Sequence, residues 1–166
     1  SGTSPKPYFL IYFIYSEIKK QCPEADISVI MSKKVFRAYA AFEEGSLYLP
    51  IPTIGNGIVF VHEFGHAFGG LHDEYLLEKE WSNLIFGNPN CVTEEKAKTS
   101  WGEHFTSEWR GCGGDCNKNT AECKETKEKY VRPTENSLMN NHNLKDGDKF
   151  NDVCKEWLIN KLNNIN

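Results

Sequence analysis

The chain has 166 residues, of which 39% are hydrophobic and 13% aromatic, and its formal net charge is −4 at pH 7. This length and composition suit one globular domain with a substantial core, and they leave little room for a large second domain. The acidic balance provides no polybasic surface, so we expect neither nucleic acid nor an anionic membrane as a partner. We therefore expect residues 1–166 to form a single domain that acts as a monomer.

The most apolar stretch lies near the start of the chain, at Tyr8–Tyr15. It is far shorter than the roughly 20 residues that span a bilayer, so we expect no membrane span. It also lacks the basic flank and the cleavage site of a signal peptide, and Ser1-Gly2 is compatible with a domain excised from a longer chain. Tyr8–Gln21 favours a largely buried helix, with an early strand as the alternative.

Three strands are predicted next. Asp26–Ser32 and Val35–Phe42 have the apolar, β-branched and aromatic content of buried strands. Ser46–Ile51 is predicted to be an edge strand, because Pro50 and Pro52 cannot donate hydrogen bonds inside a sheet. Such an edge either accepts an extended peptide or is protected by its prolines against pairing, and the sequence leaves both interpretations open.

The central motif of the chain lies between Val59 and Tyr75. Residues four apart lie on the same face of a helix, so His62 and His66 can hold one metal ion through their ring nitrogens. Glu63 then lies beside the metal, where a carboxylate can take a proton from water. The motif therefore predicts a metal site with a general base.

The end of this helix decides the third metal ligand. Gly69 is predicted to stop the helix in a left-handed conformation and to turn the chain back towards the metal. His72 then completes a three-histidine site, whose open fourth position suits a catalytic Zn²⁺ ion. Asp73 is the alternative third ligand, or else a carboxylate that orients a ligand through a hydrogen bond.

The pattern His62-Glu63-x-x-His66-x-x-Gly69-x-x-His72 resembles the long zinc-binding signature of the metzincin metallopeptidases. Two longer stretches are similar to the IgA-peptidase family of metzincins in particular. They read His-Glu-Phe-Gly-His-Ala-Phe-Gly-Gly-Leu-x-Asp-Glu-Tyr and Arg-Pro-Thr-Glu-Asn-Ser-Leu-Met. The second stretch ends at Met139, which the resemblance identifies with the methionine turn below the zinc.

The resemblance implies an α+β, metzincin-like zincin fold. An upper subdomain, about residues 1–69, would hold a small mixed sheet and the active-site helix above the cleft. A loop-rich lower subdomain, about residues 70–166, would hold the methionine turn and a C-terminal helix. The strand that borders the cleft in metzincins pairs with the substrate, and the resemblance suggests Leu47, Tyr48 and Leu49 for that role.

The implied activity is that of a zinc endopeptidase that cleaves peptide or protein substrates with water activated by Glu63. A non-catalytic, metzincin-like module that binds zinc and a partner is the alternative, and a closed structural zinc centre is a third interpretation. Some metzincins place a tyrosine two positions after the methionine to stabilise the oxyanion. Asn141 stands there in this chain, and His142 or Tyr130 could take over that role.

The chain contains six cysteines, at positions 22, 91, 112, 116, 123 and 154. An even number of this kind favours three disulfides, and with them a secreted or cell-surface protein from an oxidising compartment. The alternative is a second, structural zinc on Cys112, Cys116 and Cys123, although their spacing lacks paired C-x-x-C knuckles. Near the C-terminus, Asn151–Ile165 has helical periodicity, with Asn151 or Asp152 as the cap.

Overall fold

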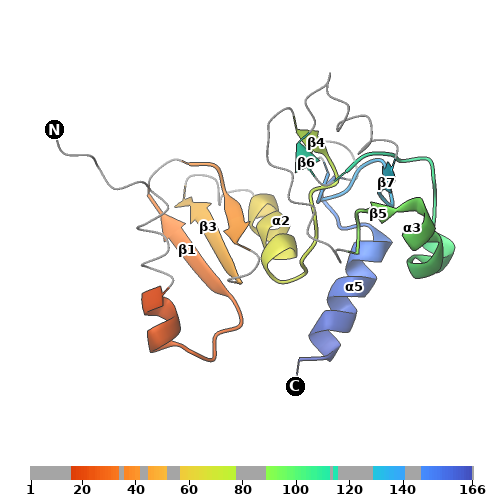
Figure 1. Cartoon of the computed structure of the whole chain (residues 1–166). Helices are drawn as coiled ribbons and strands as arrows, with labels where there is room; N and C mark the ends of the chain where they lie inside the picture. The colour runs from red at the N-terminus through yellow and green to blue at the C-terminus, as the bar shows by residue number, and fades with distance from the viewer. Residues whose placement is uncertain are drawn as a thin grey trace.

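The computed structural model describes residues 16–33, 36–41, 45–51, 57–77, 89–112, 114–115, 129–140 and 147–165. The described residues form an α+β arrangement with two parts (Figure 1). The sheet half, residues 16–67, contains a three-stranded sheet and helix α2. The loop half, residues 68–165, contains two further helices, short strands and long connections. Helix α2 lies where the two halves meet (Figure 1).

The sheet contains β1 (Ser28–Ser32), β2 (Tyr39–Ala41) and β3 (Ser46–Pro50), in the spatial order β1-β3-β2. Strand β3 runs parallel to β1 and antiparallel to β2. The predicted strands are therefore present, but the prediction that Ser46–Ile51 is an edge strand is wrong. Pro50 is tolerated because it occupies the last position of β3, opposite Ser32, where a missing N–H group interrupts little of the ladder.

This central position also corrects the predicted substrate-binding strand. Leu47, Tyr48 and Leu49 are only 0%, 2% and 1% exposed. Leu47 and Tyr48 are paired with β1 on one side and with β2 on the other, and Leu49 is paired with Met31 of β1. A substrate peptide cannot add to a strand that already has a neighbour on each side. These residues are part of the core of the sheet half and not of a peptide-binding edge.

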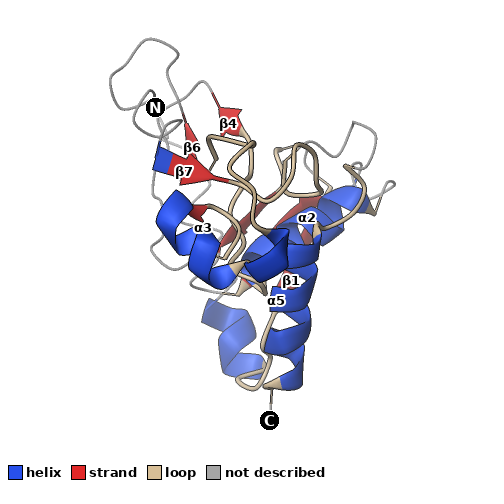
Figure 2. Ribbon diagram, turned by 90° about the vertical axis from the view of Figure 1, so that its right-hand side faces the viewer, coloured by secondary structure: helices blue, strands red, loops and turns tan. Residues whose placement is uncertain are grey.

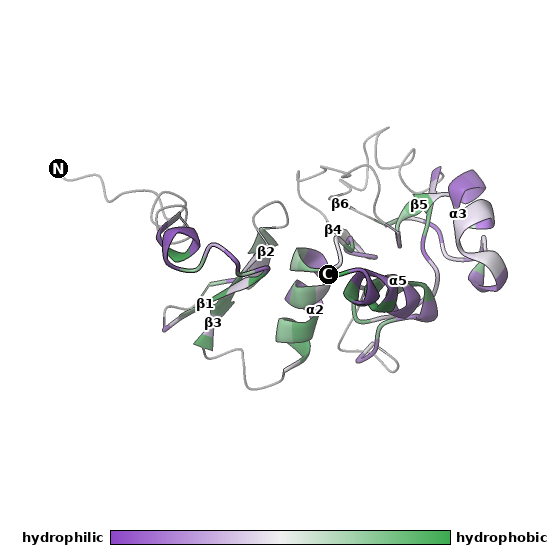
Figure 3. Ribbon diagram, turned by 90° about the horizontal axis from the view of Figure 1, so that it is seen from below, coloured by the Kyte–Doolittle hydropathy of each residue, from purple (hydrophilic) through white to green (hydrophobic). Residues whose placement is uncertain are grey.

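Helix α2 (Ile58–Ala67) packs against β2 and β3, and its start at Ile58 confirms that a helix begins where the sequence predicts one. Ala67 forms an apolar cluster with Ala38, Leu47 and Leu49 between the helix and the sheet. Figure 3 shows the mainly hydrophobic character of α2. Residues 16–21 are helical, which agrees with the end of the predicted Tyr8–Gln21 helix, and its earlier part lies outside the described residues.

Apart from its C-terminal helix, the loop half is built from short helices and strands. Strand β4 (Leu76–Leu77) pairs in parallel with β6 (Gly114–Asp115), and β5 (Val92–Thr93) pairs antiparallel with β7 (Tyr130–Val131). Helix α3 (Glu94–Ser100) and the 3-10 helix η3 (Gly102–His104) follow β5. Buried Trp101 packs with Val92, Val131 and Val153 as a small second core.

Helix α5 (Asp152–Asn163) confirms the predicted C-terminal helix and its cap, because the Asn151 side chain accepts a hydrogen bond from the backbone N–H of Cys154. Figure 2 shows α5 running down to the C-terminus from below α2. Two of its side chains bond to the segment that directly follows α2. Trp157 Nε1 donates to the carbonyl oxygen of Gly69 at 2.7 Å, and Lys161 Nζ donates to that of Phe68 at 2.6 Å.

The cysteine predictions are only partly correct. Cys91 and Cys112 form a disulfide, whereas Cys22 and Cys154 are free thiols, so the prediction of three disulfides is wrong. Cys116 and Cys123 lie outside the described residues. The alternative zinc site on Cys112 is also wrong, since that sulfur is bonded to Cys91. Among the described helices, none is both long enough and apolar enough to cross a membrane.

Candidate metal centre

Helix α2 presents His62, Glu63 and His66 towards the loop half. The two histidines are one helical turn apart, and their Nε2 atoms lie 3.2 Å from each other. Their rings are almost perpendicular, at 89°, with centroids 4.7 Å apart. The spacing of the motif therefore brings both Nε2 atoms to one point, as the sequence predicts.

The turn after α2 differs from the prediction by one residue. Gly69 still continues the helical hydrogen bonding, with its N–H bonded to the carbonyl oxygen of Gly65 at 3.0 Å. Gly70 has the left-handed conformation, with φ of 66°, and its N–H bonds to the carbonyl oxygen of His66. A Cβ on Gly69 would lie 2.7 Å from Leu158 Cδ2, so this glycine is needed for the close approach of α5.

Because the left-handed turn is at Gly70 and not at Gly69, a different side chain lies next to the two histidines. Asp73 Oδ1 lies 3.2 Å from His62 Nε2 and 3.1 Å from His66 Nε2. His72 is not among the three side chains whose ligand atoms converge, although its ring is near enough to His66 and Asp73 for their charges to act on its pKa, which burial lowers. Its backbone N–H and carbonyl groups are both bonded to the Asn90 side chain, at 2.9 and 2.8 Å. The expectation that Asp73 faces away from the histidines is therefore wrong. The third member is Asp73, the alternative that the sequence also offered.

The two histidines are oriented from behind by backbone carbonyl groups. His62 Nδ1 lies 2.8 Å from the carbonyl oxygen of Leu138, and His66 Nδ1 lies 2.6 Å from that of Leu71. A carbonyl oxygen can only accept, so each Nδ1 carries a hydrogen and donates it. In the neutral rings both Nε2 atoms are then left with lone pairs that point at each other and at Asp73.

Three acceptor atoms at one point favour positive charge between them, either a proton on an imidazole ring or a bound metal ion. His62, His66 and Asp73 each offer one ligand atom to this group. Two ligands of a tetrahedral ion with bonds of about 2.0–2.1 Å lie about 3.3–3.4 Å apart. The observed separations of 3.1–3.2 Å are close to this value. The donor set and its spacing therefore fit a small tetrahedral metal ion that keeps one position open.

The electrostatics of the cluster are consistent with a cation site. Burial works against the charge of Asp73, yet hydrogen bonds from His62 and His66 in their protonated forms, which carry a hydrogen on Nε2 as well, hold the pKa of its carboxyl group well below the usual range. Burial also acts to lower the pKa of His66, but the contact with Asp73 raises it overall. The carboxylate thus stabilises positive charge at the point where the three side chains meet.

Glu63 lies on the same helix beside this cluster and is only 6% exposed. Burial raises the pKa of its carboxyl group, while the nearby His66 and His62 act in the opposite direction. A carboxylate in such a place is less well solvated than in water, which strengthens it as a base. Its place next to His62 on the same helix, near the charges of both histidines and Asp73, suits proton transfer.

Met139 lies directly against the histidine helix. A Cβ placed on Gly65 would meet Met139 Sδ at 2.9 Å, so the sulfur fills the space next to the helix between His62 and His66. The side chain is fully buried and packs with Leu71 and Leu158. The turn that carries it also provides the Leu138 carbonyl that orients His62.

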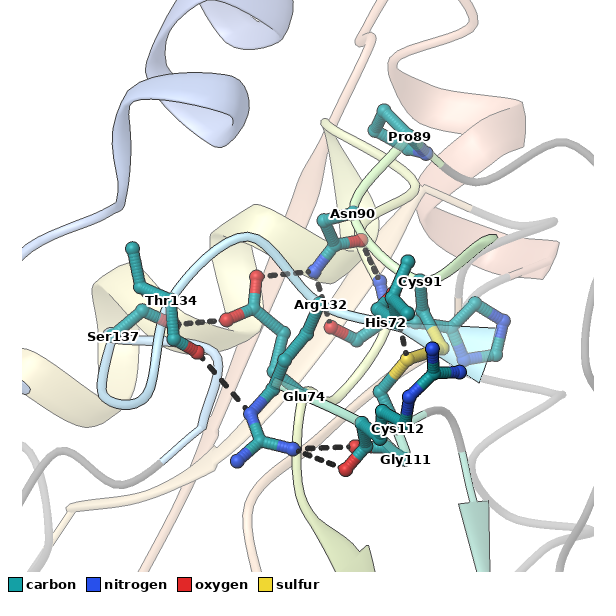
Figure 4. Close-up of a disulfide and its surroundings, with 12 residues drawn as sticks. His72, Glu74, Pro89, Asn90, Cys91, Gly111, Cys112, Arg132, Thr134 and Ser137 are labelled. Atoms are coloured by element: carbon teal, nitrogen blue, oxygen red, sulfur yellow. Dashed lines mark hydrogen bonds between the residues drawn. A yellow bond between two sulfur atoms is a disulfide. The ribbon is translucent and has the colours of Figure 1, made fainter. Parts of the chain in front are cut away.

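Glu74 forms the centre of a buried polar network that sequence reasoning missed (Figure 4). Its carboxylate is completely buried and accepts hydrogen bonds from Ser137 Oγ at 2.6 Å, Asn151 Nδ2 at 2.8 Å and Asn90 Nδ2 at 3.0 Å. Its backbone N–H donates to the carbonyl oxygen of Met139 at 2.7 Å. The network joins the Asp73 segment to the methionine turn and to α5. The only signal in the sequence was the position of Glu74 within Asp-Glu-Tyr.

The proposed substitutes for the missing tyrosine have different outcomes. Tyr130 lies in β7 and pairs with Thr93, and no contact among the described residues connects it to the histidines. His142 lies outside the described residues. Tyr75 and Arg37, which the sequence did not single out, do lie near the cluster, with Arg37 Nη2 donating to Tyr75 Oη at 2.9 Å.

Comparison with known proteins adds no family assignment. No protein-family model matches the chain, and no curated protein sequence matches it. What the site can do must therefore be argued from its own residues.

Proposed function

We propose that this chain is a zinc-dependent endopeptidase in which His62, His66 and Asp73 hold one Zn²⁺ ion and Glu63 is the general base. The observation that carries the proposal is the convergence of two Nε2 atoms and one carboxylate oxygen within 3.2 Å of one another. Imidazole and carboxylate ligands in a tetrahedral set with one open position are typical of catalytic zinc.

The open position distinguishes this set from a structural centre. Structural zinc sites are closed by four protein ligands, whereas only three side chains converge among the described residues. When bound, zinc supplies the Lewis-acid chemistry of peptide hydrolysis, since it polarises a carbonyl group and makes water acidic near neutral pH. Three protein ligands thus favour catalysis over a purely structural role.

Glu63 performs the proton transfers. Its carboxylate accepts a proton from the attacking water and passes it to the nitrogen of the leaving amine. The adjacent helical position fixes the carboxylate beside the two histidines without making it a ligand of the same ion. Peptide-bond hydrolysis is the reaction that uses this combination of a polarising cation and a positioned base.

The resemblance to metzincins supports the same activity. The residues His62-Glu63-x-x-His66 and the methionine turn at Met139 are the parts of that signature which lie together around the cluster. Asp73 takes the place that the three-histidine signature gives to a third histidine. The Cys91–Cys112 disulfide supports a location outside the cytoplasm, because disulfides persist in oxidising compartments.

The decisive experiment compares the zinc-loaded chain with its Glu63→Gln variant on a diverse peptide library, with cleavage products identified by mass spectrometry. We expect hydrolysis by the wild type and a loss of about 10² to 10⁴ in rate for the variant, the usual contribution of a positioned base. Zinc content and the circular dichroism spectrum should not change, since glutamine preserves the shape of the side chain.

Equal rates for the two proteins would refute the role of Glu63. Peptide binding without any cleavage by the wild type would favour the alternative of a non-catalytic zinc-binding module. A chain with no affinity for zinc would contradict both functions.

A further inference from the structure

Arg37 connects the sheet half to the candidate metal centre. It lies just before β2, and its exposed side chain reaches across to Tyr75 of the loop half, where Nη2 donates to the hydroxyl group at 2.9 Å. The Tyr75 hydroxyl is also hydrogen-bonded to Asp73. A single hydroxyl group therefore separates the guanidinium from a proposed metal ligand.

The charge of Arg37 acts on the centre itself. Burial raises the pKa values of Glu63 and Tyr75, and the positive charge of Arg37 opposes the rise in both. The guanidinium is thus close to the proposed base as well as to the proposed ligand Asp73. It contributes positive charge near a centre whose histidine side chains are only 8% and 18% exposed.

Among the described residues, Arg37 uses only a small part of its hydrogen-bonding capacity. A guanidinium has five N–H donors, and the bond to Tyr75 uses one of them. Among the described residues, no carboxylate forms an ion pair with Arg37. The two arginines of the loop half differ from Arg37 in this respect. Arg110 pairs with Glu94, and Arg132 donates to three backbone carbonyl groups.

We propose that Arg37 is a substrate-binding residue that pairs with a carboxylate of the peptide close to the scissile bond. The planar guanidinium matches a carboxylate with two parallel hydrogen bonds, a geometry that a lysine cannot reproduce. The carboxylate belongs either to an aspartate or glutamate side chain or to the C-terminus of the peptide, and both offer the same two oxygens. This inference rests on the proposed peptidase function and specifies its substrate class.

A purely structural role for Arg37 predicts different behaviour. If Arg37 only joined the two halves through Tyr75, its loss would lower stability and affect all peptides equally. A substrate-binding role instead changes the preference between acidic and neutral peptides. The ratio of kcat/KM for a matched peptide pair measures this preference directly, because any general loss of activity cancels.

The experiment uses the zinc-loaded chain and peptides that share one cleavable sequence. In the first set, each position flanking the cleaved bond is tested with a pair of peptides, one with glutamate and one with glutamine there. In the second set, the two peptides differ only in a free or an amidated C-terminus. We expect the wild type to favour one acidic peptide by about 10-fold, as for a charge-assisted pair. Arg37→Gln should abolish the preference and Arg37→Lys should retain part of it. The pair that responds identifies the source of the carboxylate.

Lys98→Gln is the matched control, because it removes one positive charge from α3, at the far end of the loop half (Figure 1). It should leave the preference unchanged. A wild type without preference, a preference that survives in Arg37→Gln, or an equal loss in Lys98→Gln would each overturn the inference.

A binding measurement separates this inference from the peptidase proposal. Fluorescence anisotropy with the same labelled peptides and the Glu63→Gln variant needs no turnover. If the wild type cleaves peptides without preference, the peptidase function stands and the role of Arg37 is wrong. If nothing is cleaved but acidic peptides bind more tightly by an Arg37-dependent factor, the role of Arg37 stands and the peptidase function is wrong. Equal binding of both peptides in the absence of cleavage overturns the role of Arg37 as well.

Discussion

In the sheet half, β2 and β3 pack against α2 through aliphatic side chains such as Leu47, Leu49 and Ala67. In the loop half, the residues next to the candidate metal centre are fixed by the buried carboxylate of Glu74, its amide and hydroxyl partners, and a disulfide. Regular backbone satisfies its own hydrogen bonds, whereas irregular backbone needs side-chain partners when it is buried.

The difference explains how the candidate centre is assembled. The sheet half supplies His62, Glu63 and His66 in a register that the helix itself guarantees. The loop half supplies Asp73 and the Leu138 carbonyl from segments that have no regular structure. Asn90 and Glu74 help to hold these segments in place, because their side chains bond to the His72 backbone and to Ser137. The four predictions that follow test this division of roles.

The largest effect should be on zinc affinity, and it should distinguish Asp73 from its neighbour His72 as the third ligand. Asp73→Ala removes one of three proposed ligands, and we expect zinc affinity to fall on the order of 10³-fold, since zinc sites contribute about 10–16 kcal/mol over a full set of ligands. His72→Ala should weaken binding by about 10-fold at most, because its backbone bonds to Asn90 do not need the ring. Competition with a chromogenic chelator measures both. A steep loss for His72→Ala with little change for Asp73→Ala would restore the three-histidine site.

Shortening a buried side chain in the sheet half tests whether apolar packing stabilises that half. Leu47 is fully buried, so Leu47→Ala should lower the free energy of unfolding by about 2–5 kcal/mol. Met31→Ala on β1 is the control, because Met31 is 60% exposed and should cost less than about 0.5 kcal/mol. Urea unfolding of the metal-free chain gives both values. Similar losses for the two variants would contradict an apolar core between sheet and helix.

Removal of the disulfide tests the loop half. Cys91 and Cys112 are 21 positions apart, and a loop of that size predicts about 3 kcal/mol of stabilisation. Cys91 follows Asn90, which holds the backbone of His72, so the double variant Cys91→Ser/Cys112→Ser should also weaken zinc binding through a less restrained Asp73. Cys22→Ser is the control for an exposed free thiol. Unchanged zinc affinity in the double variant would show that the Asn90 bonds suffice without the disulfide.

The smallest effect concerns an exposed polar contact of the loop half. His104 Nε2 lies 3.0 Å from Glu156 Oε1, and this hydrogen bond raises the pKa of the histidine. A raised pKa in the folded state stabilises the fold below the unfolded pKa of about 6.5, and this stabilisation is lost as pH rises through the folded value. The free energy of unfolding of the wild type should exceed that of Glu156→Gln by about 0.5 kcal/mol or less at pH 6. Urea unfolding should show no difference between the two proteins at pH 8. A difference that grows with pH would refute the assignment.

Local sequence was sufficient for the elements whose pattern repeats along the chain. The start of α2 at Ile58, the placement of His62 and His66 on one face, and the Asn151 cap of α5 all follow from helical periodicity and capping chemistry. Strands β1 and β2 were likewise predicted, although β2 covers only Tyr39–Ala41 of the predicted segment. These features depend on residues within a few positions of each other, which is why one sequence suffices to predict them.

Tertiary structure decided the features that depend on distant partners. Strand β3 is central because β1 and β2 pair with its two sides, and no property of Pro50 could reveal that. The choice of Asp73 over His72 followed from a turn one residue longer than predicted, and from Asn90, 18 positions away, which fixes the His72 backbone. Cys91 pairs with Cys112 because the fold brings them together, while Cys154 is buried beside Glu74. Periodicity determines which face a residue occupies, but only packing determines what that face meets.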